Sequence, residues 1–219
     1  MLFAPSQTGA ADLRTYRLLQ LGGAKVKWTA AQPGSATLVS YAYVTSRLRF
    51  PTARNCAEMI PLDSLVAESG LSYADVQNEI AEAFHMWSSV ANISFREVEV
   101  GETADILIGA QGAPDARAFA DVSNPLGEQI QRSLVCLNPI IKWKIGFDGD
   151  LDVYDIRYTV AHEIGHAIGL DHPSRSGELM SYRYDELFRV LQRGDIEGAV
   201  ALYGSRKYSH SATGATPAE

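Results

Sequence analysis

Three histidines and a glutamate in one short stretch carry the clearest chemistry in this sequence. His162 and His166 lie four residues apart with Glu163 between them, in AHEIGHAIGLDH (161–172). On an α-helix this spacing places two side chains on one face, about 40° apart, so that both imidazoles reach a single metal ion. Imidazole nitrogen is a common zinc ligand at about 2.1 Å. The spacing therefore predicts a metal-binding helix.

A third ligand is expected from His172, beyond a glycine that ends the helix. A continued helix would carry His172 about 9 Å along the axis from His166, out of reach of the same ion. Gly169 has no Cβ and favours left-handed backbone at a helix C-terminus, which would turn the chain so that His172 returns to the metal. Three neutral imidazoles leave a fourth position for water, as in catalytic zinc sites. Glu163 is then suited to accept a proton from that water as general base.

A chance origin of this pattern is rare. Five fixed positions at average amino-acid usage recur by chance in a chain of this length with a probability below about 10⁻⁴. The stretch holds three of the five histidines of the chain. The other two, His85 on a predicted helix and His210 in the C-terminal tail, are assigned no function.

Helices and strands of both kinds are expected around this motif. Helical spacing of apolar residues, after a capping pair at Ser72 and Asp75, predicts a helix at 73–90. The metal-binding helix is expected at about 155–170 and a third helix at about 191–203. Alternating, β-branched or apolar runs predict strands at 37–44, 93–100, 104–110 and 133–138. Residues 116–122 are a candidate edge strand. Residues 1–35 are predicted to form an extended N-terminal segment, and 45–71 a long surface connection with one helical turn at 62–68.

The composition is that of a soluble globular protein. Of 219 residues, 46% are hydrophobic and 21% charged, which predicts one domain or two small lobes. The net charge of -7 and the lack of a basic stripe argue against nucleic acid as a partner. No apolar run approaches the roughly 18 residues that a membrane-spanning helix needs, so membrane insertion is not expected. The first residues do not resemble a signal peptide, although removal of a leader would leave the same sequence.

The two cysteines leave two alternatives open. Cys56 and Cys136 are too few for a disulfide scaffold, and neither has the spacing of metal ligands. They form either one bridge in an oxidising compartment or two buried thiols. A bridge requires their Cα atoms to come within about 6 Å, which the sequence does not show.

HEIGHAIGLDH (162–172) followed by LMSY (179–182) resembles the metzincin clan of zinc endopeptidases, and within it the matrixins. The eight-residue step from His172 to Met180 and the patterns at 83–98 and 193–204 are also matrixin-like. The resemblance covers most of residues 25–204. It implies an α+β metzincin fold, with a twisted mixed sheet and two long helices in an upper lobe and a small lower lobe that ends in a C-terminal helix.

The resemblance also implies boundaries for a single catalytic domain over residues 1–204. The upper lobe would span about 25–172 and the lower lobe about 173–204, after an extended segment at 1–24. The small polar tail at 205–219 is expected to be disordered.

Site roles follow from the same resemblance. It implies that His162, His166 and His172 bind one catalytic zinc, that Glu163 is the general base, and that Met180 forms the turn beneath the metal. A protein or peptide substrate would bind in extended form as a strand added to the sheet edge, within 113–122. The resemblance also implies that the protein is secreted or periplasmic and is a monomer.

The sequence departs from the matrixin pattern at Tyr182. Matrixins commonly have proline two residues after the Met-turn methionine, whereas Met-x-Tyr is similar to serralysins and astacins. That likeness implies that Tyr182 donates a hydrogen bond to the oxyanion of the transition state. The alternative is a tyrosine that only lines the pocket wall.

Metal content is a second departure. Matrixins usually bind a structural zinc in the region matching 109–138, and this chain has no histidine there, so one zinc is expected. The acidic loop 146–152 leaves two alternatives, an ordinary solvated loop or a calcium site. The calcium ligands would be Asp148, Asp150 and Asp152.

Two functions remain open from the sequence. The first is a zinc-dependent endopeptidase, in which residues 182–190 wall the pocket for the side chain that follows the cut. Leu187 and Phe188 in that segment indicate an apolar preference. The alternative is a catalytically inactive or latent zinc-containing module that holds a peptide or an inhibitor. The intact Glu163 favours the enzyme.

Overall fold

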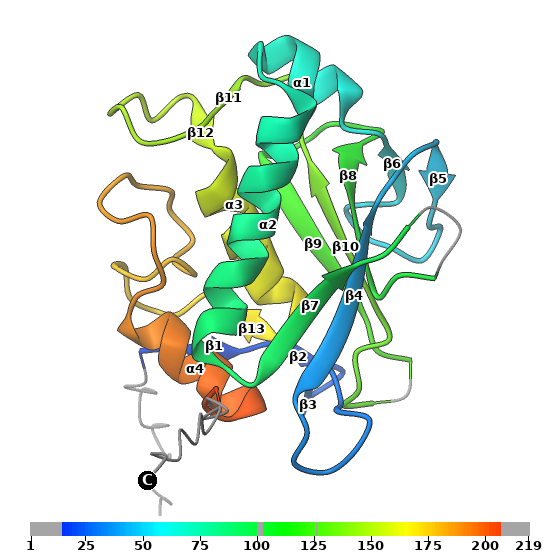
Figure 1. Ribbon diagram of the computed structural model, residues 1–219, viewed down its shortest axis with the longest axis vertical. Helices are drawn as coiled ribbons and strands as arrows, with labels where there is room; N and C mark the ends of the chain where they lie inside the picture. Colours follow the sequence, from blue (N-terminus) through cyan, green and yellow to red (C-terminus); the bar gives the residue numbers. More distant parts are fainter. Residues whose placement is uncertain (1–14, 100–102, 126, 207–219) are drawn as a thin grey trace, which may run out of the picture.

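The core of the protein is a mixed β-sheet with helices packed on one face (Figure 1). The computed structural model describes residues 15–99, 103–125 and 127–206. Seven strands form the main sheet: β4 (Thr37–Tyr43), β5 (Leu48–Arg49), β6 (Glu58–Ile60), β7 (Ile93–Glu97), β8 (Ile106–Gln111), β9 (Ala118–Ser123) and β10 (Arg132–Leu137). The strands predicted at 37–44, 104–110 and 133–138 are thereby confirmed. The strand predicted at 93–100 ends at Glu97, and residue 100 lies outside the described ranges.

Among the residues that the structure describes, the sheet ends in an antiparallel strand that pairs on one side only. Strand β4 pairs in parallel with β7 and β8, and β8 pairs in parallel with β10. Strand β9 runs antiparallel to β10 and is the last strand of the order β5-β6-β8-β10-β9. This confirms the edge strand predicted at 116–122. A free edge is where an extended peptide adds to a sheet.

Two long helices cross the same face of the sheet (Figure 1). Helix α2 (Tyr73–Val90) begins where predicted, because Ser72 Oγ accepts a hydrogen bond from the Asp75 backbone amide at 3.1 Å. Helix α3 (Ile156–Ala167) carries the histidine motif. Trp87 lies at the interface between the helices, where its Nε1 donates to the Ala161 carbonyl at 2.9 Å. Helix α2 is thus hydrogen-bonded to the backbone beside the first histidine.

The remaining elements are short. A single helical turn was expected at 62–68, and α1 (Asp63–Ser69) occupies that place. Helix α4 (Arg193–Tyr203) confirms the third predicted helix. The expected tail at 205–219 lies outside the described residues from 207 onward, as do residues 1–14 of the N-terminal segment. Within the described ranges, no helix is both long and apolar enough to cross a bilayer.

Two segments differ from the prediction. Residues 45–71 are not simply a surface connection, because β5 and β6 join the main sheet and Met59 is fully buried. The N-terminal segment forms β1 (Arg17–Leu18), which pairs with β13 (Leu170–Asp171), and a hairpin of β2 (Gln20–Leu21) and β3 (Ala24–Lys25). Strands of two or three residues carry no detectable period, which is why the sequence did not reveal them.

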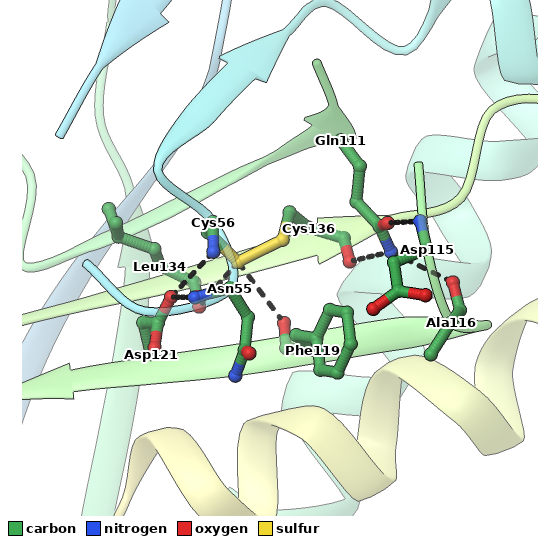
Figure 2. The surroundings of a disulfide bond; sticks show 9 residues. All are labelled: Asn55, Cys56, Gln111, Asp115, Ala116, Phe119, Asp121, Leu134 and Cys136. Atoms are coloured by element: carbon green, nitrogen blue, oxygen red, sulfur yellow. Dashed lines mark hydrogen bonds between the residues drawn. A yellow bond between two sulfur atoms is a disulfide. The ribbon is translucent and has the colours of Figure 1, made fainter. Parts of the chain in front are cut away.

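A disulfide settles the question left open by the two cysteines (Figure 2). Cys56 precedes β6 and Cys136 lies on β10, with their Cα atoms 5.9 Å apart. The carboxylate of Asp121 on β9 accepts hydrogen bonds from the backbone amides of Asn55 and Cys56, at 2.8 and 2.6 Å. The bridge and this carboxylate therefore hold the loop before β6 onto the sheet near its open edge.

Removal of the disulfide is expected to destabilise the fold. The bridge links residues 80 positions apart, and constraining so long a loop in the unfolded chain typically contributes about 2–4 kcal/mol. Thermal unfolding of the Cys56→Ala/Cys136→Ala protein should give a Tm several degrees below the wild-type value. Reductant should lower the wild-type Tm in the same way and leave that of the double variant unchanged. An equal Tm for the two proteins would contradict a stabilising bridge.

Candidate metal centre and cleft

The three predicted ligand atoms converge on one point. The Nε2 atoms of His162 and His166 each lie 3.1 Å from Nε2 of His172. Two ligands held about 2.1 Å from a tetrahedral zinc are about 3.4 Å apart, so this spacing fits one such ion. Among the residues that the structure describes, this is the only group of three or more histidine, cysteine or acidic side chains placed to hold a metal.

Backbone carbonyls fix which nitrogen of each helical histidine faces the centre. His162 Nδ1 lies 2.8 Å from the Leu179 carbonyl, and His166 Nδ1 lies 2.9 Å from the Leu170 carbonyl. A carbonyl oxygen only accepts, so Nδ1 carries the proton in both rings and Nε2 presents a lone pair. Such outer contacts orient the rings before metal arrives.

Burial keeps the imidazoles in the neutral form that binds metal. It holds the pKa of His162 well below its usual value and lowers that of His166 to about 4. The pKa of His172 is also lowered, again mainly by burial. Neutral imidazole is the ligating form of histidine, so the donor set suits zinc at neutral pH.

Gly169 makes the turn that returns His172 to the centre. Its φ of 104° lies in the left-handed region, and a Cβ placed there would come within 2.2 Å of the Val26 carbonyl oxygen. The Leu19 amide donates to the Gly169 carbonyl at 2.8 Å. The glycine is thus required both by the backbone conformation and by the close approach of the N-terminal segment.

Met180 lies directly beneath the helix that carries His162 and His166. A Cβ added at Gly165 would meet Met180 Sδ at 2.2 Å, so the two are in close contact. The carboxylate of Asp195, on α4, accepts hydrogen bonds from the amides of Leu179 and Met180 at 2.8 and 3.0 Å. Since the Leu179 carbonyl orients His162, Asp195 positions that ligand indirectly.

Glu163 and Tyr182 flank the histidines in different environments. Glu163 is 5% exposed, and burial raises its pKa to about 7. Tyr182 is 78% exposed, and its ring lies edge-on to His172 with 5.2 Å between ring centroids. The structure therefore brings both predicted catalytic side chains to the three histidines.

A cleft runs from the histidines along the edge strand. Its lining includes β9 and the residues just before it, Glu163, Tyr182, and the disulfide-held loop with Phe50 and Asn55. An extended peptide can thus reach the free edge of the sheet and the three histidines together.

The segment after Met180 is tied to the start of α3 by ion pairs. Arg189 bonds Asp155, the N-cap of α3, at 2.7 Å, and also pairs with Glu79 of α2. Arg157 bonds Glu79 at 2.7 Å. The carboxylates are buried, so each guanidinium supplies the partner that a buried charge requires.

The acidic loop 146–152 does not gather its aspartates around one point. Asp148 pairs with Lys144, whose ammonium also donates to the Asp150 carbonyl at 2.7 Å. The Asp150 carboxylate accepts from the Asp152 amide at 3.0 Å. The Lys144 ammonium thus contacts two residues of this loop, which supports the ordinary-loop alternative.

Sequence reasoning missed the residues that support the ligands. The Leu170 and Leu179 carbonyls have no sequence signal, because any residue supplies a carbonyl. Asp195 could be found only as an acidic residue in the first turn of α4. Arg117, which lines the cleft, carried no motif at all.

A helix with two histidines four residues apart, a glycine turn that returns a third and a methionine turn beneath them form the arrangement of a zinc metallopeptidase domain of the metzincin type. The family model described as Matrixin matches residues 64–204. The chain therefore belongs to the matrixin family, whose α+β fold the structure shares.

Individual relatives agree with this assignment. The interstitial collagenase of Oryctolagus cuniculus is 35% identical over 141 residues, which are 61% of this chain and 29% of that protein. Matrix metalloproteinase-19 of Mus musculus is 33% identical over 142 residues, 63% of this chain and 27% of that protein. Metalloendoproteinase 1-MMP of Arabidopsis thaliana is 33% identical over 143 residues, which are 61% of this chain and 39% of that protein. The chain thus spans well under half the length of these relatives.

Proposed function

We propose that this protein is a zinc-dependent endopeptidase that hydrolyses internal bonds of extended protein or peptide substrates. His162, His166 and His172 hold one zinc, and Glu163 is the general base. The observation that carries this proposal is the convergence of three Nε2 atoms beside a buried carboxyl group, at a cleft along a free sheet edge.

The chemistry divides between the metal and the chain. Zinc bound at the histidines would polarise the scissile carbonyl and lower the pKa of water. Glu163 accepts a proton from the attacking water and passes it to the leaving amine. A carboxyl group with a pKa near 7 suits both directions of this transfer at neutral pH.

Tyr182 is proposed to donate a hydrogen bond to the oxyanion. Its exposed side chain beside His172 is free to point into the cleft. Tyr182→Phe should lower kcat by about 10²-fold with little change in KM or zinc content, because the lost bond forms only in the transition state. Steady-state kinetics on one peptide would measure this, with Tyr73→Phe as a control away from the cleft. A kcat within twofold of wild type would leave Tyr182 as a pocket wall only.

Substrate is proposed to pair with β9 as an added antiparallel or parallel strand, with residues 182–190 near the side chain that follows the cut. The disulfide supports a secreted or periplasmic location, because disulfides persist in oxidising compartments. Cell fractionation with detection of this chain tests the location, and recovery from the cytosol alone would contradict it.

Cleavage profiling tests the proposed function. The zinc-loaded protein is incubated with a diverse peptide mixture, and the products are identified by mass spectrometry. We expect cuts at internal bonds that disappear with a chelator and return when zinc is added. A protein that holds zinc and cuts nothing would contradict the enzyme and favour the binding module.

A further inference from the structure

Arg117 brings a positive charge into the cleft and makes no ion pair with a carboxylate among the described residues, although its charge acts to lower the pKa of Glu163. It lies directly before β9 and lines the cleft together with Glu163 and Tyr182. Its Nε is buried without a hydrogen-bond partner, and its terminal nitrogens make no ion pair with the described part of the chain. A half-buried cation without a partner is costly, so a substrate group that pairs with it would bind favourably.

Two aromatic rings contact the guanidinium of Arg117. Arg117 Cζ lies 4.8 Å from the ring centroid of Tyr154 and 5.4 Å from that of Tyr184. Cation–π contacts use no hydrogen bond, so they leave the terminal N–H groups of the guanidinium available to a ligand. The side chain is therefore oriented before substrate binds.

The backbone beneath Arg117 is fixed as well. The Asn138 amide donates to the Arg117 carbonyl at 2.9 Å. Figure 2 shows the buried Gln111 reaching toward the neighbouring loop, where its Nε2 donates to the Ala116 carbonyl at 3.0 Å and its Oε1 accepts from the Asp115 amide at 2.9 Å. Such anchoring lowers the entropy lost on binding.

The apolar side chains expected near this position do not face the cleft. Phe188 and Tyr184 pack against the buried Tyr158, with ring centroids 6.4 and 5.1 Å away, and neither is part of the cleft lining. Leu187 is 81% exposed and is likewise absent from the lining. Arg117 therefore lines the cleft, whereas Leu187 and Phe188 do not.

Apart from Glu163, the other charged side chains in the cleft lining are paired or exposed. Asp121 accepts two backbone amides, and Asp171 pairs with Arg17 at 3.1 Å. Arg54 and Arg132 are exposed, where solvent and salt weaken charge interactions.

We propose that Arg117 selects substrates with a carboxylate side chain, aspartate or glutamate, at the residue that follows the cut. This inference rests on the proposed endopeptidase function and replaces the apolar preference that Leu187 and Phe188 indicated. A guanidinium fork matches the two oxygens of a carboxylate. We assign Arg117 to the substrate residue that follows the cut because Arg117 contacts Tyr184. Tyr184 belongs to the segment 182–190, which is proposed to lie near the side chain of that substrate residue.

The test compares peptides that differ only in the residue after the cut, which is Glu, Gln or Lys. For wild type we expect kcat/KM for the Glu peptide to exceed that for the Gln peptide by about 10-fold or more. Arg117→Gln should abolish this preference, and Arg117→Glu should shift it toward the Lys peptide. A merely structural role for Arg117 would not reverse the charge preference. Arg193→Gln, on the exposed surface of α4 and outside the cleft lining, is the matched control, and Tm and zinc content verify that each variant is folded.

Peptide hydroxamates that carry Glu or Gln beside the metal-binding group make the test independent of turnover. For wild type, the Glu compound should bind about 10-fold or more tightly than the Gln compound, and Arg117→Gln should remove the difference. Wild type that cuts peptides but treats Glu and Gln alike would overturn the role of Arg117 and leave the endopeptidase intact. Zinc-loaded wild type that cuts nothing would overturn the endopeptidase, and the hydroxamate pair would still decide whether Arg117 selects a carboxylate.

Discussion

Glu163→Gln is expected to lower kcat by about 10²–10⁴-fold while zinc content stays at the wild-type level. Glutamine has nearly the same shape as glutamate, but it cannot accept a proton from the attacking water. The Leu170 and Leu179 carbonyls, rather than Glu163, hold the rings of the two helical histidines. The metal site should therefore persist when the base is lost. Single-turnover kinetics on a peptide found by cleavage profiling, together with elemental analysis, measure both quantities.

A matched control separates this effect from a general loss of charge. Glu68→Gln makes the same chemical change on the exposed face of α1 and should leave kcat unchanged. Retention of more than about a tenth of wild-type kcat by Glu163→Gln would contradict its role as general base.

Gly169→Ala is expected to destabilise the protein by at least about 2 kcal/mol and to weaken zinc binding by about 10-fold or more. The new Cβ would meet the Val26 carbonyl oxygen, a backbone atom, at 2.2 Å. The turn must then shift, and His172 lies only three residues beyond it. Denaturant unfolding measures the free energy of unfolding, and competition with a chromogenic chelator measures zinc affinity.

Gly177→Ala isolates the contribution of the backbone angle. Gly177 has a φ of 99°, close to that of Gly169, but a Cβ there meets nothing within 4 Å. Gly177→Ala should lower the free energy of unfolding by only about 1 kcal/mol, the strain of a left-handed alanine. Its zinc affinity should equal that of wild type. Equal losses of stability in the two variants would contradict the close contact with Val26.

The sequence predicted the long elements because each carries its own period. Helix α2 has a capping serine and five buried apolar residues at helical spacing: Val76, Ile80, Ala83, Phe84 and Trp87. Strand β8 was predicted from a short apolar run. By contrast, β1 pairs with β13 through only two residues on each strand, and so short a pairing depends on tertiary contacts that no local pattern records.

The convergence of the three histidines was predictable from spacing, and the groups that support them were not. The four-residue step on a helix and the glycine turn fix the relative placement of His162, His166 and His172 through local geometry alone. Asp195 reaches the methionine turn only because α4 packs beneath it. The preference expected from Leu187 and Phe188 assumed that apolar residues near the site face the cleft, whereas Phe188 packs against Tyr158.

Zinc titration of the metal-free protein, with peptide cleavage followed at each step, tests the central claim most directly. The claim is that one zinc held by three histidines is responsible for hydrolysis. We predict that cleavage rises in proportion to added zinc and reaches a plateau at one zinc per chain, and that His166→Ala shows no rise over the same range. Full cleavage by the metal-free protein, or an unchanged titration for His166→Ala, would contradict the claim.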